Sequence, residues 1–301
     1  MNPALQAPGV WLDARSLIAL RAHVLNGAET EAQAALPGGF VTRRRGQGQE
    51  VADVRQYVTG DDIRHLDRGS TARTGVLHVR SFQEERDQVT FLVADFRPSM
   101  LWGTRRAFRS VAAAEALSLI GWRAIEEGGR VGLLVIGPKL PVVTSIRGRA
   151  RGMLAVIGAM ARAHATVLEE AQSGRVDDID LDGALARVTR LAPAGAELVI
   201  ASGFDRPGGD LSDRLGQLAR RRHPRLVMVG DGIEALPPGS YPIRLADGSH
   251  RLGRIEQGPG DTRPEPLAGF PMLRVDAAAP LAQMARVING GFPRREGVSD
   301  G

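Results

Sequence analysis

The chain has 301 residues, 43% of them hydrophobic and 24% charged, so it can bury a core of ordinary size and is not a disordered polymer. It has no cysteine, which excludes a disulfide framework, thiolate metal sites and cysteine nucleophiles. The net charge is only +5, so the basic balance does not by itself favour a nucleic-acid partner.

Two further features favour a cytoplasmic protein. The sequence has no run of roughly 20 apolar residues, the length needed to span a bilayer. Its N-terminus also lacks the basic and then apolar pattern of a secretion signal. We therefore expect a cytoplasmic chain that does not insert into a membrane.

The first part of the chain carries one helical pattern and then a long polar segment. Apolar residues at helical spacing predict a helix over 13–35, with Asp13 as its N-cap. Residues 40–85 are polar and rich in Arg and Asp. Only 77–82 alternate between polar and apolar residues, which predicts one strand there.

From residue 88 onward, continuous apolar runs alternate with amphipathic segments. The runs predict strands over 88–95, 130–136, 142–146, 197–202 and 225–230. The segments between them predict helices over 104–127, 148–165, 181–192 and 211–222. This alternation indicates an α/β fold with a doubly wound, mainly parallel sheet that is buried on both faces. Its functional loops should follow the carboxyl ends of the strands.

The composition divides the chain into four regions. After residue 235 the sequence becomes rich in Pro and Gly, and 241–245 and 250–255 flank an Asp-Gly pair typical of a hairpin. A last helix is expected over 276–288. We therefore expect an N-terminal helix and Arg/Asp-rich segment over 1–86, an α/β domain over 87–235, a C-terminal hairpin and helix over 236–291, and a disordered tail over 292–301.

Two stretches together resemble a known bacterial family. The second is the loop 95–100, and the first contains Arg55, Tyr57, Gly60, Asp61, Arg64, Asp67 and Arg73. They resemble the family called domain of unknown function 58, in which such a segment precedes a von Willebrand factor A-like domain. The resemblance runs from about residue 15 to about residue 260, although Arg68 stands where the family has Trp. Because members usually occur beside MoxR-type AAA+ ATPases, it implies a protein partner of such an ATPase.

The resemblance also implies where a cation could bind. von Willebrand factor A-like domains often hold Mg²⁺ in a metal-ion-dependent adhesion site, made of an Asp-x-Ser-x-Ser loop, a Thr and a second Asp. Asp95 and Ser99 fit this pattern, whereas the other three positions carry Arg97, Ile179 and Gly203. A guanidinium beside Asp95 repels a divalent ion. We therefore expect Arg97 to form an internal salt bridge and the site to hold no metal; alternatively, Asp95 simply caps the next turn.

The charges of the signature segment admit two interpretations. The first is a solvated loop with surface ion pairs that contribute roughly 0–1 kcal/mol each. The second is a semi-buried network, with bidentate Arg–carboxylate pairs that fasten this segment to the sheet domain. We favour the network because Tyr57, Ile63 and Leu66 place apolar groups among the charges.

The sequence as a whole favours binding over catalysis. Its histidines are scattered and no nucleophile or zinc motif is present, so we assign no catalytic residue and no cofactor. We expect a protein-interaction module that works with a MoxR-type AAA+ ATPase. The candidate binding residues are Asp95, Arg97, Ser99, Met100, Ser202 and Asp205. The alternatives are a metal-dependent hydrolase that uses Asp95 and a nucleic-acid-binding protein.

Overall fold

The computed structural model of the chain forms two compact units, one of residues 1–33 and 87–301 and the other of residues 34–86. The structure describes residues 7–25, 51–58, 63, 66–82, 88–139, 141–173, 178–232, 237–244, 249–255, 267, 269–270 and 272–291.

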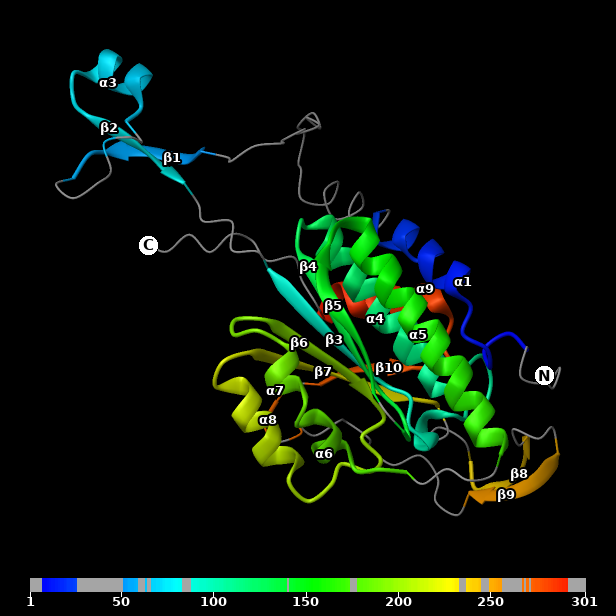
Figure 1. Ribbon diagram of the computed structural model, residues 1–301. Helices are drawn as coiled ribbons and strands as arrows, with labels where there is room; N and C mark the ends of the chain where they lie inside the picture. The colour runs from blue at the N-terminus through cyan, green and yellow to red at the C-terminus, as the bar shows by residue number, and fades with distance from the viewer. Residues whose placement is uncertain are drawn as a thin grey trace. The chain divides into compact units, whose positions relative to one another are not determined.

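The larger unit is built around a six-stranded sheet (Figure 1). In chain order its strands are β3 (Val89–Asp95), β4 (Arg130–Ile136), β5 (Val142–Gly148), β6 (Glu197–Ser202), β7 (His223–Gly230) and β10 (Met272–Asp276). Across the sheet the order is β10-β7-β6-β3-β4-β5, and only the edge strand β5 is antiparallel to its neighbour. The predicted α/β fold with a mainly parallel sheet is therefore confirmed.

The strand order places a crevice at one edge of this sheet. From β3 the chain builds outward through β4 to β5, and from β6 it builds in the other direction through β7 to β10. In a doubly wound sheet such a reversal separates the loops that follow the two central strands. The crevice thus lies at the carboxyl ends of β3 and β6, after Asp95 and Ser202.

Helices cover both faces of the sheet, and each face has its own apolar core. One face carries α1 (Ala14–Ala19), α4 (Arg109–Glu126), α5 (Arg149–Gln172) and α9 (Leu281–Gly291). The other carries α6 (Leu181–Leu185), α7 (Val188–Leu191) and α8 (Leu211–Ala219). The central strands are apolar throughout because side chains on both of their faces are buried.

The N-terminal helix belongs to the sheet unit, which differs from the expected boundary at residue 86. α1 begins after Asp13, whose carboxylate accepts hydrogen bonds from the amides of Arg15 and Ser16, as predicted for an N-cap. Its buried Leu17 accepts a hydrogen bond from the indole of Trp122 on α4, at 3.1 Å. Residues 21–25 are helical as well, and the rest of the predicted helix lies outside the described residues.

The C-terminal region also differs from the expected appendage. Residues 272–276 form β10, which pairs in parallel with β7 and completes the main sheet. α9 begins at Leu281, five residues later than predicted, and buries Met284, Ala285 and Ile288 in the core. Only β8 (Gly239–Arg244) and β9 (His250–Ile255) form a separate hairpin as expected. The turn between them and the tail over 292–301 lie outside the described residues.

The smaller unit consists of an antiparallel pair, β1 (Val51–Gln56) and β2 (His78–Phe82), with α3 (Arg68–Thr74) between them in the chain. Asp67 caps α3 by accepting a hydrogen bond from the amide of Ser70 at 2.7 Å, and Arg73 donates to the hydroxyl of Ser70. Gly60, Asp61, Arg64 and the side chain of Arg55 lie outside the described part of the chain. The expected charge network therefore stays a prediction.

Among the described residues, no helix combines the length and the apolar character that a membrane crossing requires.

Candidate functional site

The candidate site lies in the crevice at the carboxyl ends of β3 and β6. β3 is buried to its last residue, Asp95, and the amide of Phe96 still bonds to the carbonyl of Ile136 on β4, at 2.8 Å. Pro98 then opens the short 3-10 helix η3 (Pro98–Met100), because its fixed φ suits the first helical position. This turn directs the side chain of Arg97 back into the crevice toward Asp95.

Arg97 and Asp95 form a bidentate ion pair without exposure to solvent. Nε of Arg97 donates to Oδ1 of Asp95 at 2.9 Å, and Nη2 donates to Oδ2 at 2.8 Å. The amide of Arg97 adds a third hydrogen bond to Oδ1, at 3.0 Å. Both side chains are 0% exposed. The internal salt bridge expected from the sequence is thus confirmed.

The same guanidinium joins two further loops to the first. Its Nη1 donates to the carbonyl of Ile179 at 2.5 Å and to the carbonyl of Arg206 at 2.9 Å. Ile179 lies just before α6, and Arg206 lies in the loop after β6. The three loops come from distant parts of the chain. The hydrogen bonds of this one side chain hold them together.

The loop after β6 is held to the site by three more contacts. Ser202 donates its hydroxyl proton to Oδ2 of Asp95 at 2.6 Å and accepts a hydrogen bond from the amide of Phe204 at 3.0 Å. The amide of Gly203 lies 3.1 Å from the sulfur of the buried Met100. Both carboxylate oxygens of Asp95 therefore accept two hydrogen bonds each.

A second buried arginine, Arg109, also holds the loop after β6. Nε of Arg109 on α4 donates to the carbonyl of Val229 at 2.8 Å, and its Nη1 lies 2.8 Å from Oδ2 of Asp205. Its guanidinium also stacks over the ring of Trp102. A Cβ atom on Gly203 would overlap this guanidinium and the carboxylate of Asp205, so a side chain there would displace Arg109 or Asp205.

The charges of the crevice keep Arg97 ionised. Burial alone would lower the pKa of Arg97, but the hydrogen bonds and charge of Asp95 outweigh it, and Asp178 and Asp205 add further attraction. The pKa of Arg97 is therefore raised above its ordinary value. Removing either partner of such a buried pair lowers the stability of the fold strongly, because the remaining charge would be buried without a counter-charge.

The residues present do not fit a divalent cation. Mg²⁺ requires a shell of oxygen ligands, whereas both carboxylate oxygens of Asp95 already accept hydrogen bonds from Arg97 and Ser202, and the carbonyl of Ile179 accepts one from Arg97. At position 179 the main-chain carbonyl faces the guanidinium, and at position 203 the space for a side chain is filled by Arg109. Nor do the described residues contain a cluster of three acidic or histidine side chains that could hold a metal ion.

The structure brings most of the sequence-predicted residues together. Asp95, Arg97 and Ser202 are in direct contact, while Met100 and Asp205 join them through Gly203 and Arg109. The hydroxyl of Ser99 is buried and has no hydrogen-bond partner among the described residues. Of the six, Asp205 is exposed and Ser99 is half-buried, whereas the four buried residues position the loops.

Sequence reasoning missed the residues that complete the site. Arg109 had one available signal, because it is a charged residue at the first position of a helix whose next five residues are small or apolar. The carbonyls of Ile179 and Arg206 gave none, since any residue type supplies that acceptor. The tie between the loops could therefore be anticipated only at Asp95 and Arg97.

A second buried acid lies at the end of β7. Asp231 is 1% exposed, and burial raises its pKa to about 6. The charge of Asp276 acts in the same direction, whereas Thr104 and Arg109 oppose it. Thr104 nevertheless donates its hydroxyl proton to the main-chain carbonyl of Asp231, and no described group makes a well-aligned hydrogen bond to the carboxylate.

One buried histidine also has a hydroxyl partner. Nε2 of His164 on α5 lies 2.9 Å from Oγ of Ser110 on α4, and both residues are fully buried. Burial lowers the pKa of His164 to about 4, so the ring is neutral at physiological pH. The pair links α4 to α5 in the core of this face of the sheet.

Comparison with known proteins gives a family and three relatives without an assigned activity. The profile of the family described as "Protein of unknown function DUF58" matches residues 53–257. The uncharacterized protein Mb1516 of Mycobacterium bovis and the uncharacterized protein Rv1480 of Mycobacterium tuberculosis are each 34% identical to this chain over 125 residues. The match covers 40% of this chain and 39% of each relative.

The buried ion pair leads to a prediction for stability. Arg97→Ala should lower the free energy of unfolding by about 3–5 kcal/mol, because it leaves Asp95 buried without its counter-charge. Arg206→Ala is the matched control, since it removes only an exposed partner of Asp180 at 3.5 Å and should cost about 0–1 kcal/mol. Urea unfolding measures both variants. Equal stability of the two would contradict the role of Arg97.

The raised pKa of Asp231 predicts a pH dependence. The folded protein holds this proton up to about pH 6, whereas the unfolded chain loses it near the ordinary value of 3.8. Folding is therefore progressively penalised as the pH rises from about 4 to 6, and the penalty is constant above that range. Asp231→Asn should remove this slope and stabilise the protein by about 1–3 kcal/mol above pH 6. Unfolding free energies at several pH values, with exposed Asp210→Asn as control, test it; identical slopes for wild type and Asp231→Asn would refute it.

Proposed function

This chain belongs to the family described as Protein of unknown function DUF58, and we propose that it is a non-enzymatic protein-interaction module. In this proposal the sheet unit is von Willebrand factor A-like, and its loop edge contacts a MoxR-type AAA+ ATPase in the cytoplasm. The pair would serve the assembly or maturation of other complexes.

The observation that carries the proposal is the set of four hydrogen bonds that the side chain of Arg97 donates. Open α/β sheets bind their ligands in the crevice where the strand order reverses. In this chain a side chain of the protein itself fills that position and joins Asp95 to the carbonyls of Ile179 and Arg206. Because the crevice is filled, it is better suited to a rigid binding platform than to a reaction centre.

The fold and the loop residues support the von Willebrand factor A-like assignment. The six-stranded sheet has one antiparallel edge strand, and its central loops carry the retained Asp95 and Ser99. Each missing oxygen ligand has a counterpart of another kind: the guanidinium of Arg97, the carbonyl of Ile179, and Arg109 in the space beside Gly203. We infer a metal-ion-dependent adhesion site that has been rebuilt to work without its cation.

The exposed rim of this platform supplies the contact surface. Pro98, Leu101 and Phe204 are half-buried, and Asp205 and Arg206 are exposed. Met100 is fully buried and therefore supports the loop without touching a partner. Phe204 has a positive φ of 57°, which a residue other than glycine seldom adopts, so the rim stores local strain.

A hydrolase that uses Asp95 is less well supported. A general base or a metal ligand needs a free lone pair directed at its substrate. Both oxygens of Asp95 are already engaged by Arg97 and Ser202, and the side chain is buried.

Co-purification tests the proposal. The full chain, immobilised on a resin, should retain a purified MoxR-type ATPase from the same genome. Leu101→Glu and Arg206→Glu should each weaken retention about tenfold or more, because they place an acid on the rim.

Arg220→Glu is the control. Arg220 is exposed and lies after α8, just before β7 begins and so near the opposite edge of the sheet. Retention by this variant should equal that of the wild type. Absence of retention by the wild type, or equal losses in the rim variants and in Arg220→Glu, would count against the proposal.

A further inference from the structure

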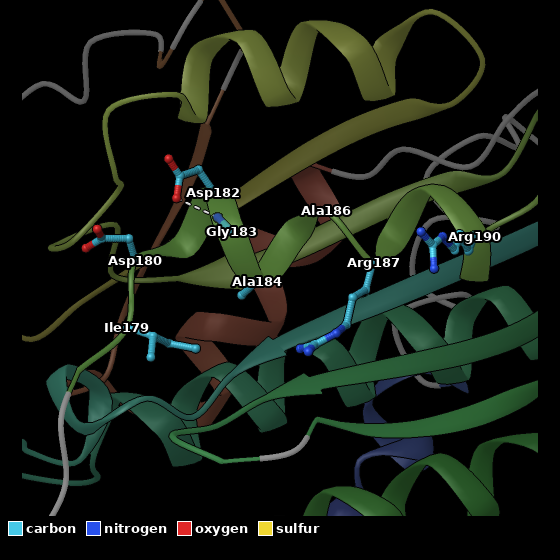
Figure 2. Close-up of a pocket in the computed structure, with 8 residues that line it drawn as sticks. All are labelled: Ile179, Asp180, Asp182, Gly183, Ala184, Ala186, Arg187 and Arg190. Carbon is cyan, nitrogen blue, oxygen red and sulfur yellow. Dashed lines mark hydrogen bonds between the residues drawn. The ribbon is translucent and has the colours of Figure 1, made fainter.

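A pocket of about 660 Å³ adjoins the platform on the α6–α7 side of the sheet (Figure 2). Small residues and charged residues line it together: Ile179, Asp180, Asp182, Gly183, Ala184, Ala186, Arg187 and Arg190. Its volume lies in the range of pockets that hold a ligand much larger than a single anion. Ile179 belongs to both features, since it lines the pocket and its carbonyl accepts a hydrogen bond from Arg97.

The acidic side chains of the pocket already have hydrogen-bond or ion-pair partners. Asp182 accepts hydrogen bonds from the amide of Gly183 and, at 3.0 Å, from the amide of Asp210. Gly208 has a positive φ of 82°, and a Cβ there would overlap the Asp182 carboxylate, so the loop closes tightly around it. Asp180 pairs with Arg206 at 3.5 Å. Asp180 is thus paired with Arg206, whereas Asp182 is held by main-chain amides and keeps its negative charge.

Arg187 and Arg190 supply the positive charge of the pocket lining. Arg187 is the N-cap of the short helix α7, and Arg190 lies three residues later, within the helix. Both are exposed, and neither side chain has an ion-pair or hydrogen-bond partner within the part of the chain that the structure describes. With Arg206 counted beside Asp180, three arginines stand against two aspartates at the pocket, and this excess of one positive charge favours an anionic ligand.

The main chain of the pocket distinguishes carboxylates from phosphates. Phosphate sites rely on free amides at a helix N-terminus or in a turn. The first amides of α6 are all used: Leu181 donates to Arg206, Asp182 to Pro207 and Gly183 to the Asp182 carboxylate. What remains is a pair of planar guanidinium forks, which match carboxylates bidentately.

We propose that this pocket binds an acidic segment of a partner protein, whose side-chain carboxylates pair with Arg187 and Arg190. The small side chains of Gly183, Ala184 and Ala186 leave room for the backbone of that segment. The inference rests on the proposed interaction function and names the chemistry of the partner. Because the pocket shares Ile179 with the tied loops, the segment docks on a surface that Arg97 already holds in place.

Peptide binding to the full chain tests this inference. The probe is a fluorescein-labelled octapeptide of alternating Glu and Ala, followed by fluorescence anisotropy at low salt, with the Gln–Ala octapeptide as its neutral counterpart. The Glu peptide should bind at least about tenfold more tightly than the Gln peptide, and added salt should weaken it. Arg187→Glu/Arg190→Glu should abolish the difference, and Arg187→Gln/Arg190→Gln should reduce it.

Arg151→Glu/Arg162→Glu is the matched control, since both residues are exposed on α5 at the other face of the sheet and carry the same charge change. Equal affinity for the two peptides, or an equal loss in this control, would overturn the inference. So would displacement of the Glu peptide by inorganic phosphate as effective as that by glutarate at the same concentration. The assay contains no ATPase. A negative result would therefore overturn only the acidic-segment inference, and the proposed ATPase contact is tested separately by co-purification.

Discussion

The buried pair between Arg97 and Asp95 is the interaction on which the site depends. Asp95 ends a fully buried strand, where an uncompensated carboxylate would be costly. Arg97 neutralises it and uses its remaining donor group to hold the carbonyls of Ile179 and Arg206. The three loops that meet at the reversal of strand order are thus joined by hydrogen bonds from one side chain. Their rigidity then follows from burial, which shields these bonds from competition by water.

The fold could be predicted from the sequence wherever a strand is buried on both faces. The runs that became β3, β4 and β6 are continuously apolar, and the structure places them within one residue of expectation. β10 escaped notice because it is five residues long, contains Arg274 and lies at the edge of the sheet. The N-terminal helix was assigned to another domain because its contact with Trp122 links residues 105 positions apart. Such long-range packing leaves no local pattern.

The site could be predicted in part for a similar reason. Asp95 and Arg97 are two residues apart, so opposite charges at a strand end already indicated their pairing. Arg109 and the pocket over α6–α7 depend on tertiary contacts with Asp205 and the loop around Gly208. The sequence does not show that Arg187 and Arg190 lack a described partner, because this depends on the partners of Asp180 and Asp182. A charge in the sequence does not state which other charge neutralises it.

We propose that the guanidinium of Arg97 stands where a metal ion would bind, so that the loops are ordered without metal. Isothermal titration of Mg²⁺, and separately of Mn²⁺, into the full chain tests it most directly. We expect no saturable binding, because Asp95 already accepts hydrogen bonds from Arg97 and Ser202. Tight, stoichiometric binding of either ion that disappears in Asp95→Ala would contradict it.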